Sequence, residues 1–270
     1  MYKKPFAIPF IGWILIGTIV PGLVIAFYGF TDRSGAFTMD NVTSILAPEH
    51  AKALWMSLLL AFISSLICLI ISLPLALILR NSKLSSKGFL VFIFILPMWM
   101  NFLLRTMAWQ VLLERGGLIN SFFENIGMPA LQIINTPVAV VLGMVYDYLP
   151  FMILPIYNSM IKIENAVIEA AYDLGATKAK VFKDVILPLS VPGIASGITM
   201  VFVPALTTFA ISNMLGGGKI YLIGNIIEQE FTTTSNWNLG SGLSLVMMVF
   251  ILVTMELMSR LDKDGDGALI

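Results

Sequence analysis

Long stretches without a charged residue constrain the fold of this chain more than any other feature of its sequence. Phe6–Phe30 is one such stretch of 25 residues, and Ala53–Leu79 is another of 27. A helix needs about 20 consecutive apolar residues to cross a hydrocarbon core about 30 Å thick, so either stretch can span a membrane. With 58% hydrophobic and 12% charged residues, the 270-residue chain has too few charges to cover a water-soluble globule. The sequence therefore predicts an integral membrane protein.

Charge and cysteine content exclude further classes. Lys and Arg total 16, as do Asp and Glu, so the chain lacks the basic excess of nucleic-acid-binding proteins. Cys68 is the single cysteine, which excludes a disulfide within the chain.

The first apolar stretch is too long for the core of a signal peptide and lacks a small-residue cleavage site, so we expect a retained helix. The expected environment is membrane lipid, with no nucleic-acid partner.

Four more apolar stretches bring the expected number of transmembrane helices to about six. Each holds at most one charged residue, and they are Gly88–Leu113, Pro137–Met160, Val185–Gly218 and Gly242–Leu257. Because a helix satisfies its own backbone hydrogen bonds inside lipid, we predict an all-α, polytopic membrane protein. We expect a single transmembrane domain over residues 1–260 and a polar cytoplasmic tail over residues 261–270.

The distribution of Lys and Arg predicts the orientation of these helices. Eleven of these residues lie at the N-terminus, in the second and fourth connections and in the tail, whereas four lie in the alternate connections. Cytoplasmic segments of membrane proteins carry the excess of Lys and Arg. We therefore expect both termini in the cytoplasm, and this alternation requires an even number of spans.

The fourth connection, residues 161–188, is cytoplasmic in this topology and has a helical pattern. Apolar residues recur at helical spacing up to Leu174, and Gly175 stands where a left-handed conformation would end the helix. Thr177 can cap a second short helix, which we expect Leu187-Pro188 to stop. From these residues alone, the helix pair is either a docking surface or an amphipathic connector on the membrane surface.

The spacing within this connection is specific. Glu169-Ala170-Ala171 is followed after three residues by Gly175, then after nine residues by Val185, one further residue and Leu187-Pro188. This pattern resembles the EAA motif of ABC-importer permeases, where isoleucine stands at the position of Val185. The resemblance implies a loop that docks on an ATP-hydrolysing subunit and transmits its closure to the membrane helices. The implied ATPase-coupling residues are Glu169, Ala170, Ala171, Gly175, Leu187 and Pro188.

Other segments extend the resemblance over most of the chain. They are similar to permeases of spermidine/putrescine importers, and they are Leu96–Trp99, Leu104–Trp109, Gly117–Asn120, Leu149–Met152 and Leu215–Asn225. The resemblance implies a type I ABC importer fold in a bacterial cytoplasmic membrane. It also implies a homologous second permease subunit, two copies of an ABC ATPase that binds ATP and magnesium, and an extracellular substrate-binding protein. No cofactor is expected in this chain, and the expected substrate is a polyamine or, alternatively, another small solute.

The connection after the fifth span faces outward in this topology. Residues Gly216–Asn225 then lie where the binding protein of this family docks. We expect Gly217, Gly218 and Lys219 to contact that protein, and an ordinary flexible loop is the alternative.

One carboxylate falls deep inside a predicted span. Asp147 lies between Tyr146 and Tyr148, and ionisable side chains at such depth usually mark a function. A polyamine needs carboxylates to balance its ammonium groups and aromatic faces for cation–π contacts. We therefore expect these three side chains and Trp109 to line a substrate pathway, with Arg105 in a gating or structural role. The alternative is that Asp147 and Arg105 form a purely structural bridge.

Enzyme and channel functions fit the sequence less well. Gly216–Lys219 lacks the first glycine and the Ser or Thr of a phosphate-binding loop, so this chain is not expected to hydrolyse ATP. An intramembrane protease would need a second Asp or a histidine within the membrane, but His50 lies in a connection. The tail over Asp262–Gly267 opens like a calcium loop and ends before its twelfth position. A cation channel would not need the docking loop.

Overall fold

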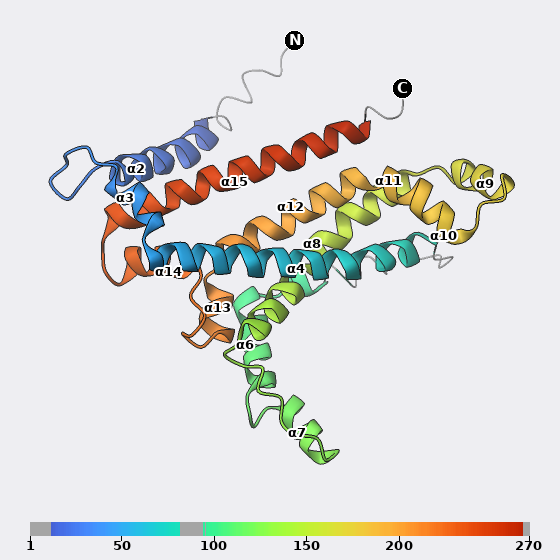
Figure 1. Ribbon diagram of the computed structural model, residues 1–270, viewed down its shortest axis with the longest axis horizontal. Coiled ribbons are helices and arrows are strands. Elements are labelled where there is room, and N and C mark those ends of the chain that lie inside the picture. The colour runs from blue at the N-terminus through green and yellow to red at the C-terminus, as the bar shows by residue number, and fades with distance from the viewer. Residues whose placement is uncertain (1–11, 82–93, 95, 267–270) are drawn as a thin grey trace, which may run out of the picture. The chain divides into compact units, whose positions relative to one another are not determined.

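Helices form the regular structure of the residues that the computed structural model describes, which are 12–81, 94 and 96–266 (Figure 1). The exception among those residues is one isolated β-bridge between Thr31 and Phe37. The prediction of an all-α polytopic protein is confirmed. The chain divides into two compact units, the first comprising Met1–Trp55 and Ile223–Ile251, the second Met56–Leu222 and Leu252–Ile270.

The described residues form a series of helical elements. In order they are the π-helix η2 (Leu15–Ile19), α2 (Val20–Gly29), α3 (Asp40–Thr43), the 3₁₀-helix η3 (Ser44–Leu46), α4 (Pro48–Asn81), the 3₁₀-helix η4 (Leu96–Trp99), α6 (Phe102–Leu113), α7 (Leu118–Asn125), α8 (Pro137–Lys162), α9 (Asn165–Asp173), α10 (Lys178–Val181), the π-helix η5 (Phe182–Ile186), α11 (Leu187–Leu189), α12 (Val191–Thr207), α13 (Ala210–Leu215), α14 (Ile223–Thr232) and α15 (Trp237–Asp266).

Four helices in the described part of the chain are long and apolar enough to cross a membrane. They are Gly12–Gly29, Pro48–Asn81, Pro137–Lys162 and Trp237–Arg260, and they match the first, second, fourth and sixth predicted spans. The α4 helix is longer than predicted because Pro48 and Glu49 suit a helix start and Arg80 suits its last turn. The α15 helix continues to Asp266, into the segment predicted as a polar tail.

The third predicted span, Gly88–Leu113, is interrupted where it can be described. Its residues 88–93 and 95 lie outside the described part of the chain, and the remainder consists of η4 and α6. The break has a local cause, since the Asn101 side chain accepts hydrogen bonds from the backbone N–H of Leu103 at 2.9 Å and of Leu104 at 3.4 Å. Asn101 thereby caps a new helix rather than continuing the previous one.

The fifth predicted span, Val185–Gly218, is not one straight helix. The segments Lys178–Leu189 and Val191–Thr207 meet at 65°, and by length and composition the pair is either a broken span or a re-entrant segment. The predicted stop at Leu187-Pro188 is confirmed to within about one residue, because the π-helix η5 leads into α11, which ends at Leu189. The bend comes at Ser190, whose side-chain hydroxyl donates to the Ile186 carbonyl at 2.7 Å.

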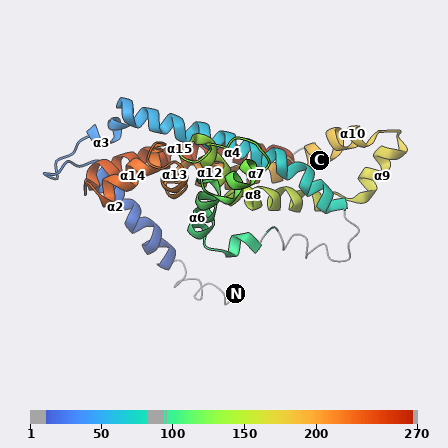
Figure 2. The ribbon, with the colours of Figure 1, turned by 90° about the horizontal axis from the view of Figure 1, so that it is seen from below.

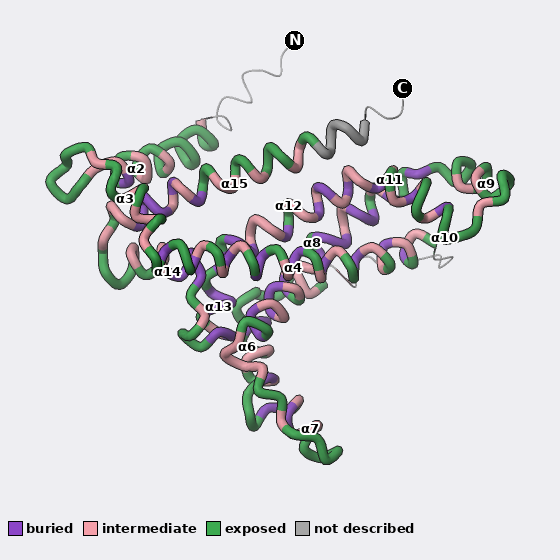
Figure 3. Tube along the Cα trace, viewed as in Figure 1, coloured by how far each residue is buried: buried purple, intermediate pink, exposed green. Residues whose placement is uncertain are grey.

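The core of the second unit lies between α8 and α12. Figure 3 shows buried positions recurring along both helices, and Met144, Met152, Ile156 and Met160 of α8 are fully buried. Glycines allow the close approach, since a Cβ on Gly193 would lie 2.5 Å from the Ser159 Cβ and 2.6 Å from the Pro155 carbonyl oxygen. Small residues at helix interfaces are typical of membrane proteins, where association depends on close packing.

The first unit joins the N-terminal helix to the start of α15. A Cβ on Gly29 would lie 2.5 Å from Cδ1 of Leu245 and 3.3 Å from the Gly242 backbone N, so α2 and α15 approach closely here and a larger residue would have to displace the leucine side chain. The Asn238 side chain donates to the Thr31 carbonyl oxygen at 2.7 Å, which ties the end of α2 to α15.

Candidate functional site

Residues 161–188, which we call the coupling loop after the role predicted for them, form a hairpin of short helices beyond the end of α8 (Figures 1 and 2). The first helix, α9, ends in a turn that requires glycine. Gly175 has φ +81°, its N–H donates to the Tyr172 carbonyl at 2.8 Å, and the Ala176 N–H donates to the Ala171 carbonyl at 3.1 Å. This is a Schellman motif, and the predicted helix-ending role of Gly175 is confirmed.

The second half of the coupling loop is anchored to the core. The Thr177 hydroxyl oxygen accepts from the Lys180 N–H at 3.4 Å, so the predicted cap is present. Val181 and Ile186 are buried, Leu187 is half-buried and Pro188 is exposed. A hollow of about 210 Å³ lies between the two halves, and it is lined by Ala171, Leu174, Gly175, Ala176, Lys180, Val181, Asp184 and Val185.

The outer face of α9 is exposed among the residues that the structure describes, and many of its side chains are apolar. Glu169 and Ala170 are exposed, whereas Ala171 packs against the core. Leu174 is 89% exposed, and Tyr172, which the sequence analysis did not single out, is also exposed. The exposed Leu174 and Tyr172 are candidate contact residues for the docking role predicted from the sequence.

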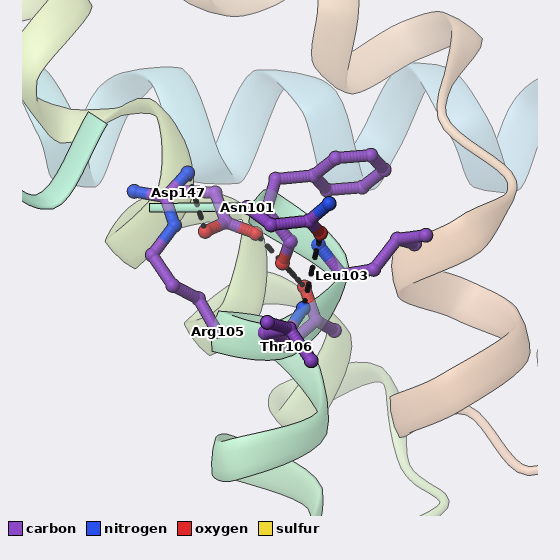
Figure 4. A network of polar contacts seen from close by, with 7 residues as sticks. Asn101, Leu103, Arg105, Thr106 and Asp147 are labelled. Atoms are coloured by element: carbon purple, nitrogen blue, oxygen red, sulfur yellow. Dashed lines mark hydrogen bonds and ion pairs between the residues drawn. The ribbon is translucent and has the colours of Figure 1, made fainter. Parts of the chain in front are cut away.

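A buried ion pair connects α6 to α8 (Figure 4). Arg105 Nη2 lies 3.3 Å from Asp147 Oδ1, and both side chains are almost fully buried. The Thr106 hydroxyl donates to Asp147 Oδ2 at 3.1 Å. The capped start of α6 at Asn101 aims Arg105 and Thr106 toward α8, so local chain geometry sets the position of the pair. Thr106 lies in a segment that carries the family resemblance, but the sequence analysis gave it no role at the site because a threonine in an apolar helix carries no signal of its own.

Two aromatic side chains join this pair and one turns away from it. The Arg105 guanidinium carbon lies 5.9 Å from the centre of the Tyr146 ring, and the Trp109 ring meets Tyr146 edge-on at 5.4 Å. The Tyr148 hydroxyl donates to the Pro204 carbonyl of α12 at 3.4 Å, so its hydroxyl end points to a different neighbour. The structure therefore brings together four of the five residues predicted for a substrate pathway.

The ion pair leaves hydrogen-bonding capacity unused. Arg105 Nε and Nη1 have no hydrogen-bond partner in the described structure, and Asp147 Oδ1 has the ion pair alone. Buried charged groups are usually fully hydrogen-bonded, because an unmade bond costs about 1–3 kcal/mol or more for a charged group. This arrangement can accept a further polar group, or exchange one partner for another, at less cost than a saturated network.

The connection between α13 and α14 forms a tight turn with an exposed tip. Gly217 and Gly218 have φ values of +54° and +70°, and both are exposed together with Lys219. A Cβ on Gly217 would overlap the Asn135 side chain, so this glycine is needed for contact with the segment before α8. The Asn135 N–H donates to the Leu215 carbonyl at 2.9 Å, which fixes the base of the turn.

These features together define a polytopic membrane transport subunit. The family of binding-protein-dependent transport system inner membrane components matches residues 72–264, and the chain belongs to this family. It is 35% identical to the spermidine/putrescine transport system permease protein PotB of Haemophilus influenzae, over 93% of this chain and 91% of that one. It is 36% identical to the protein of the same name from Escherichia coli, over 88% and 90% of the two chains.

Solved structures show the same fold at low sequence identity. A bacterial ABC transporter involved in the import of the acidic polysaccharide alginate matches with a TM-score of 0.80 and 18% identity, over 97% of this chain and 94% of that chain. The MetNI methionine ABC transporter matches with a TM-score of 0.57 and 18% identity, over 80% and 95% of the two chains. The predicted ABC importer permease fold is confirmed.

Proposed function

We propose that this chain is a permease subunit of an ATP-driven importer that brings polyamines, such as spermidine and putrescine, into the cell. The observation that carries the substrate is the similarity to PotB proteins over nearly the whole chain. The buried Asp147 between aromatic side chains supports it, since a polycation leaving water needs a compensating negative charge.

The proposed assembly contains a homologous second permease, two copies of an ABC ATPase and an extracellular substrate-binding protein. ATP and magnesium bind the ATPase copies, and this chain itself holds no cofactor. Both termini face the cytoplasm, as the excess of Lys and Arg in alternate connections favours. The Gly217–Lys219 tip then faces outward and contacts the binding protein.

Coupling to ATP hydrolysis proceeds through the coupling loop. Glu169 and Ala170 present an exposed edge of α9, and the exposed Leu174 supplies an apolar anchor beside them. When the ATPase copies close, they move this edge. Because Ala171, Val181 and Val185 belong to the same packed cluster as α8, the movement reaches the membrane helices without a flexible link.

Within the membrane, Asp147 alternates between two cations. Arg105 neutralises the carboxylate when no substrate is present, at an Nη2–Oδ1 distance of 3.3 Å. An arriving ammonium group takes the place of the guanidinium, which keeps its contact with the Tyr146 ring. At an effective dielectric constant of about 20, a contact at 4 Å is worth about 4 kcal/mol before desolvation, and this gain has to offset the cost of leaving the buried Arg105 without its carboxylate.

Uptake by the reconstituted complex tests the proposal. We expect ATP-dependent accumulation of radiolabelled spermidine or putrescine in proteoliposomes, and none when the ATPase is omitted. Uptake of an amino acid or an anion instead of a polyamine would contradict the substrate. Ion conductance without ATP would contradict the importer and favour a channel.

A further inference from the structure

Arg80 joins the end of one membrane helix to the start of the coupling loop. It lies in the last turn of α4, and its Nε donates to the Met160 carbonyl oxygen at 2.8 Å. Its Nη2 donates to the Ile163 carbonyl oxygen at 2.9 Å and to Asn165 Oδ1 at 3.2 Å. One guanidinium group therefore holds the end of α8, the residue that follows it and the first residue of α9.

Two of the three acceptors are carbonyl oxygens at the end of α8, where a helix runs out of N–H donors of its own. The Met160 carbonyl still accepts from the Ile163 N–H at 3.3 Å, but the chain turns out of α8 at Ile163, whose backbone is extended, so the Ile163 carbonyl points out of the helix. The planar guanidinium presents several N–H donors in a fixed fork, which suits acceptors that diverge in this way. Its positive charge also favours the negative end of the α8 dipole.

The contacts lie beside an open pocket, so water competes for the same groups. The pocket has a volume of about 270 Å³ and is lined by Arg80, Ile161, Lys162, Ile163, Glu164 and Asn165. Without Arg80, the Ile163 carbonyl would turn to this water, and the angle between α8 and α9 would no longer be held from α4.

We propose that Arg80 is a positioning residue for the coupling loop. By bonding to both sides of the α8–α9 junction, it ties the inner end of α4 to the loop, so movement of the loop reaches α4 as well as α8 and α12, between which the loop lies. The inference rests on the proposed coupling function. Arg80 acts through the loop and touches neither ATP nor substrate.

Lys162 provides a matched control. It lines the same pocket, is exposed, and makes none of the three bonds of Arg80. Lys162→Gln therefore removes a positive charge from the same pocket and leaves the three hydrogen bonds of Arg80 intact. Arg80→Gln removes the fork and the charge, and Arg80→Lys keeps the charge without the fork.

The experiment compares these variants in the complete complex with the ATPase and the second permease. Hydrogen–deuterium exchange over Asn165–Gly175 is measured first, without substrate. Arg80→Gln should speed exchange by about tenfold, as expected for the loss of net hydrogen bonding at a local opening, and Arg80→Lys should give a smaller increase.

ATP hydrolysis is then measured with and without spermidine-loaded binding protein. Arg80→Gln should keep its basal rate and lose the stimulation, whereas Lys162→Gln should match the wild type in both measurements.

Two results would overturn the inference. One is wild-type exchange and stimulation in Arg80→Gln, and the other is an equal defect in Lys162→Gln, which would assign the effect to charge alone. If Arg80→Gln does not assemble, Arg80→Lys decides, because wild-type exchange in that variant contradicts a role for the fork. Exchange needs no substrate, so failure of the wild-type complex to take up spermidine counts against the proposed substrate and leaves the test of Arg80 intact.

Discussion

A carboxylate and a guanidinium that share a buried site depend on each other, and this dependence decides how Asp147 has to be tested. Removing one member of such a pair leaves the other as an unpaired buried charge, which costs about 3–5 kcal/mol. Asp147→Asn alone would therefore lower assembly as well as transport, because Arg105 would lose its partner at 3.3 Å. A single substitution cannot separate the pathway role from the structural role.

The double variant Asp147→Asn/Arg105→Gln separates them. Both replacements keep shape and remove charge, so the site stays neutral and the complex should assemble. We expect spermidine uptake per assembled complex at limiting concentration to fall at least about tenfold below that of the wild type, since about 1.4 kcal/mol of lost ammonium binding corresponds to that factor. Wild-type uptake by the double variant would show that the carboxylate is a structural bridge and would send the search to the second permease.

Gly175 is constrained by its backbone rather than by crowding within this chain. Its φ of +81° suits glycine, and a Cβ built on it meets nothing within 4 Å. Gly175→Val places a β-branched residue in a left-handed conformation, which costs at least about 1–2 kcal/mol, whereas asparagine tolerates that conformation better. We expect Gly175→Val to lose most transport and to co-purify weakly with the ATPase, and Gly175→Asn to keep most of both. Normal transport by Gly175→Val would rule out the docking role, and equal losses in the two variants would point to crowding against the ATPase.

At the scale of elements, the close contact of α12 with α8 depends on glycine. Gly193→Ala would push a methyl group to 2.5 Å from Ser159 and 2.6 Å from the Pro155 backbone oxygen, which cannot move freely. Overpacking of this kind costs about 1–3 kcal/mol. The matched control is Gly22→Ala in α2, where a Cβ meets nothing within 4 Å and alanine favours the helix. Graded denaturation of the purified protein should show lower stability for Gly193→Ala and unchanged or higher stability for Gly22→Ala. The reverse order would contradict the packing described for α8 and α12.

The elements also show which parts of the fold a sequence pattern can predict. Helices α4, α8 and α15 follow from long apolar runs because lipid leaves the backbone no alternative to a helix. The break at Asn101 was missed because hydropathy does not register a side chain that bonds to the backbone, whereas Leu187-Pro188 marked the break next to Ser190. In the candidate site, spacing predicted the turn at Gly175. The three bonds of Arg80 join residues about 80 positions apart, and no local pattern reports them.

For the whole molecule, the decisive property is which ends of the helices face outward. The excess of Lys and Arg in alternate connections predicts that Lys219 is outside and Lys178 inside, and both side chains are exposed. A cysteine at either position can be labelled selectively, because the native Cys68 is fully buried.

Lys219→Cys in intact spheroplasts should react with an impermeant maleimide, whereas Lys178→Cys should react only after the membrane is permeabilised. Ligand-loaded binding protein added from outside should slow the labelling of Lys219→Cys, because docking on the Gly217–Lys219 tip would cover it, and it should leave the labelling of Lys178→Cys after permeabilisation unchanged. The opposite pattern of labelling would invert the topology, which would remove the coupling loop from the side of the membrane where ATP is available. Protection of neither cysteine would keep the topology and exclude this tip from the docking surface.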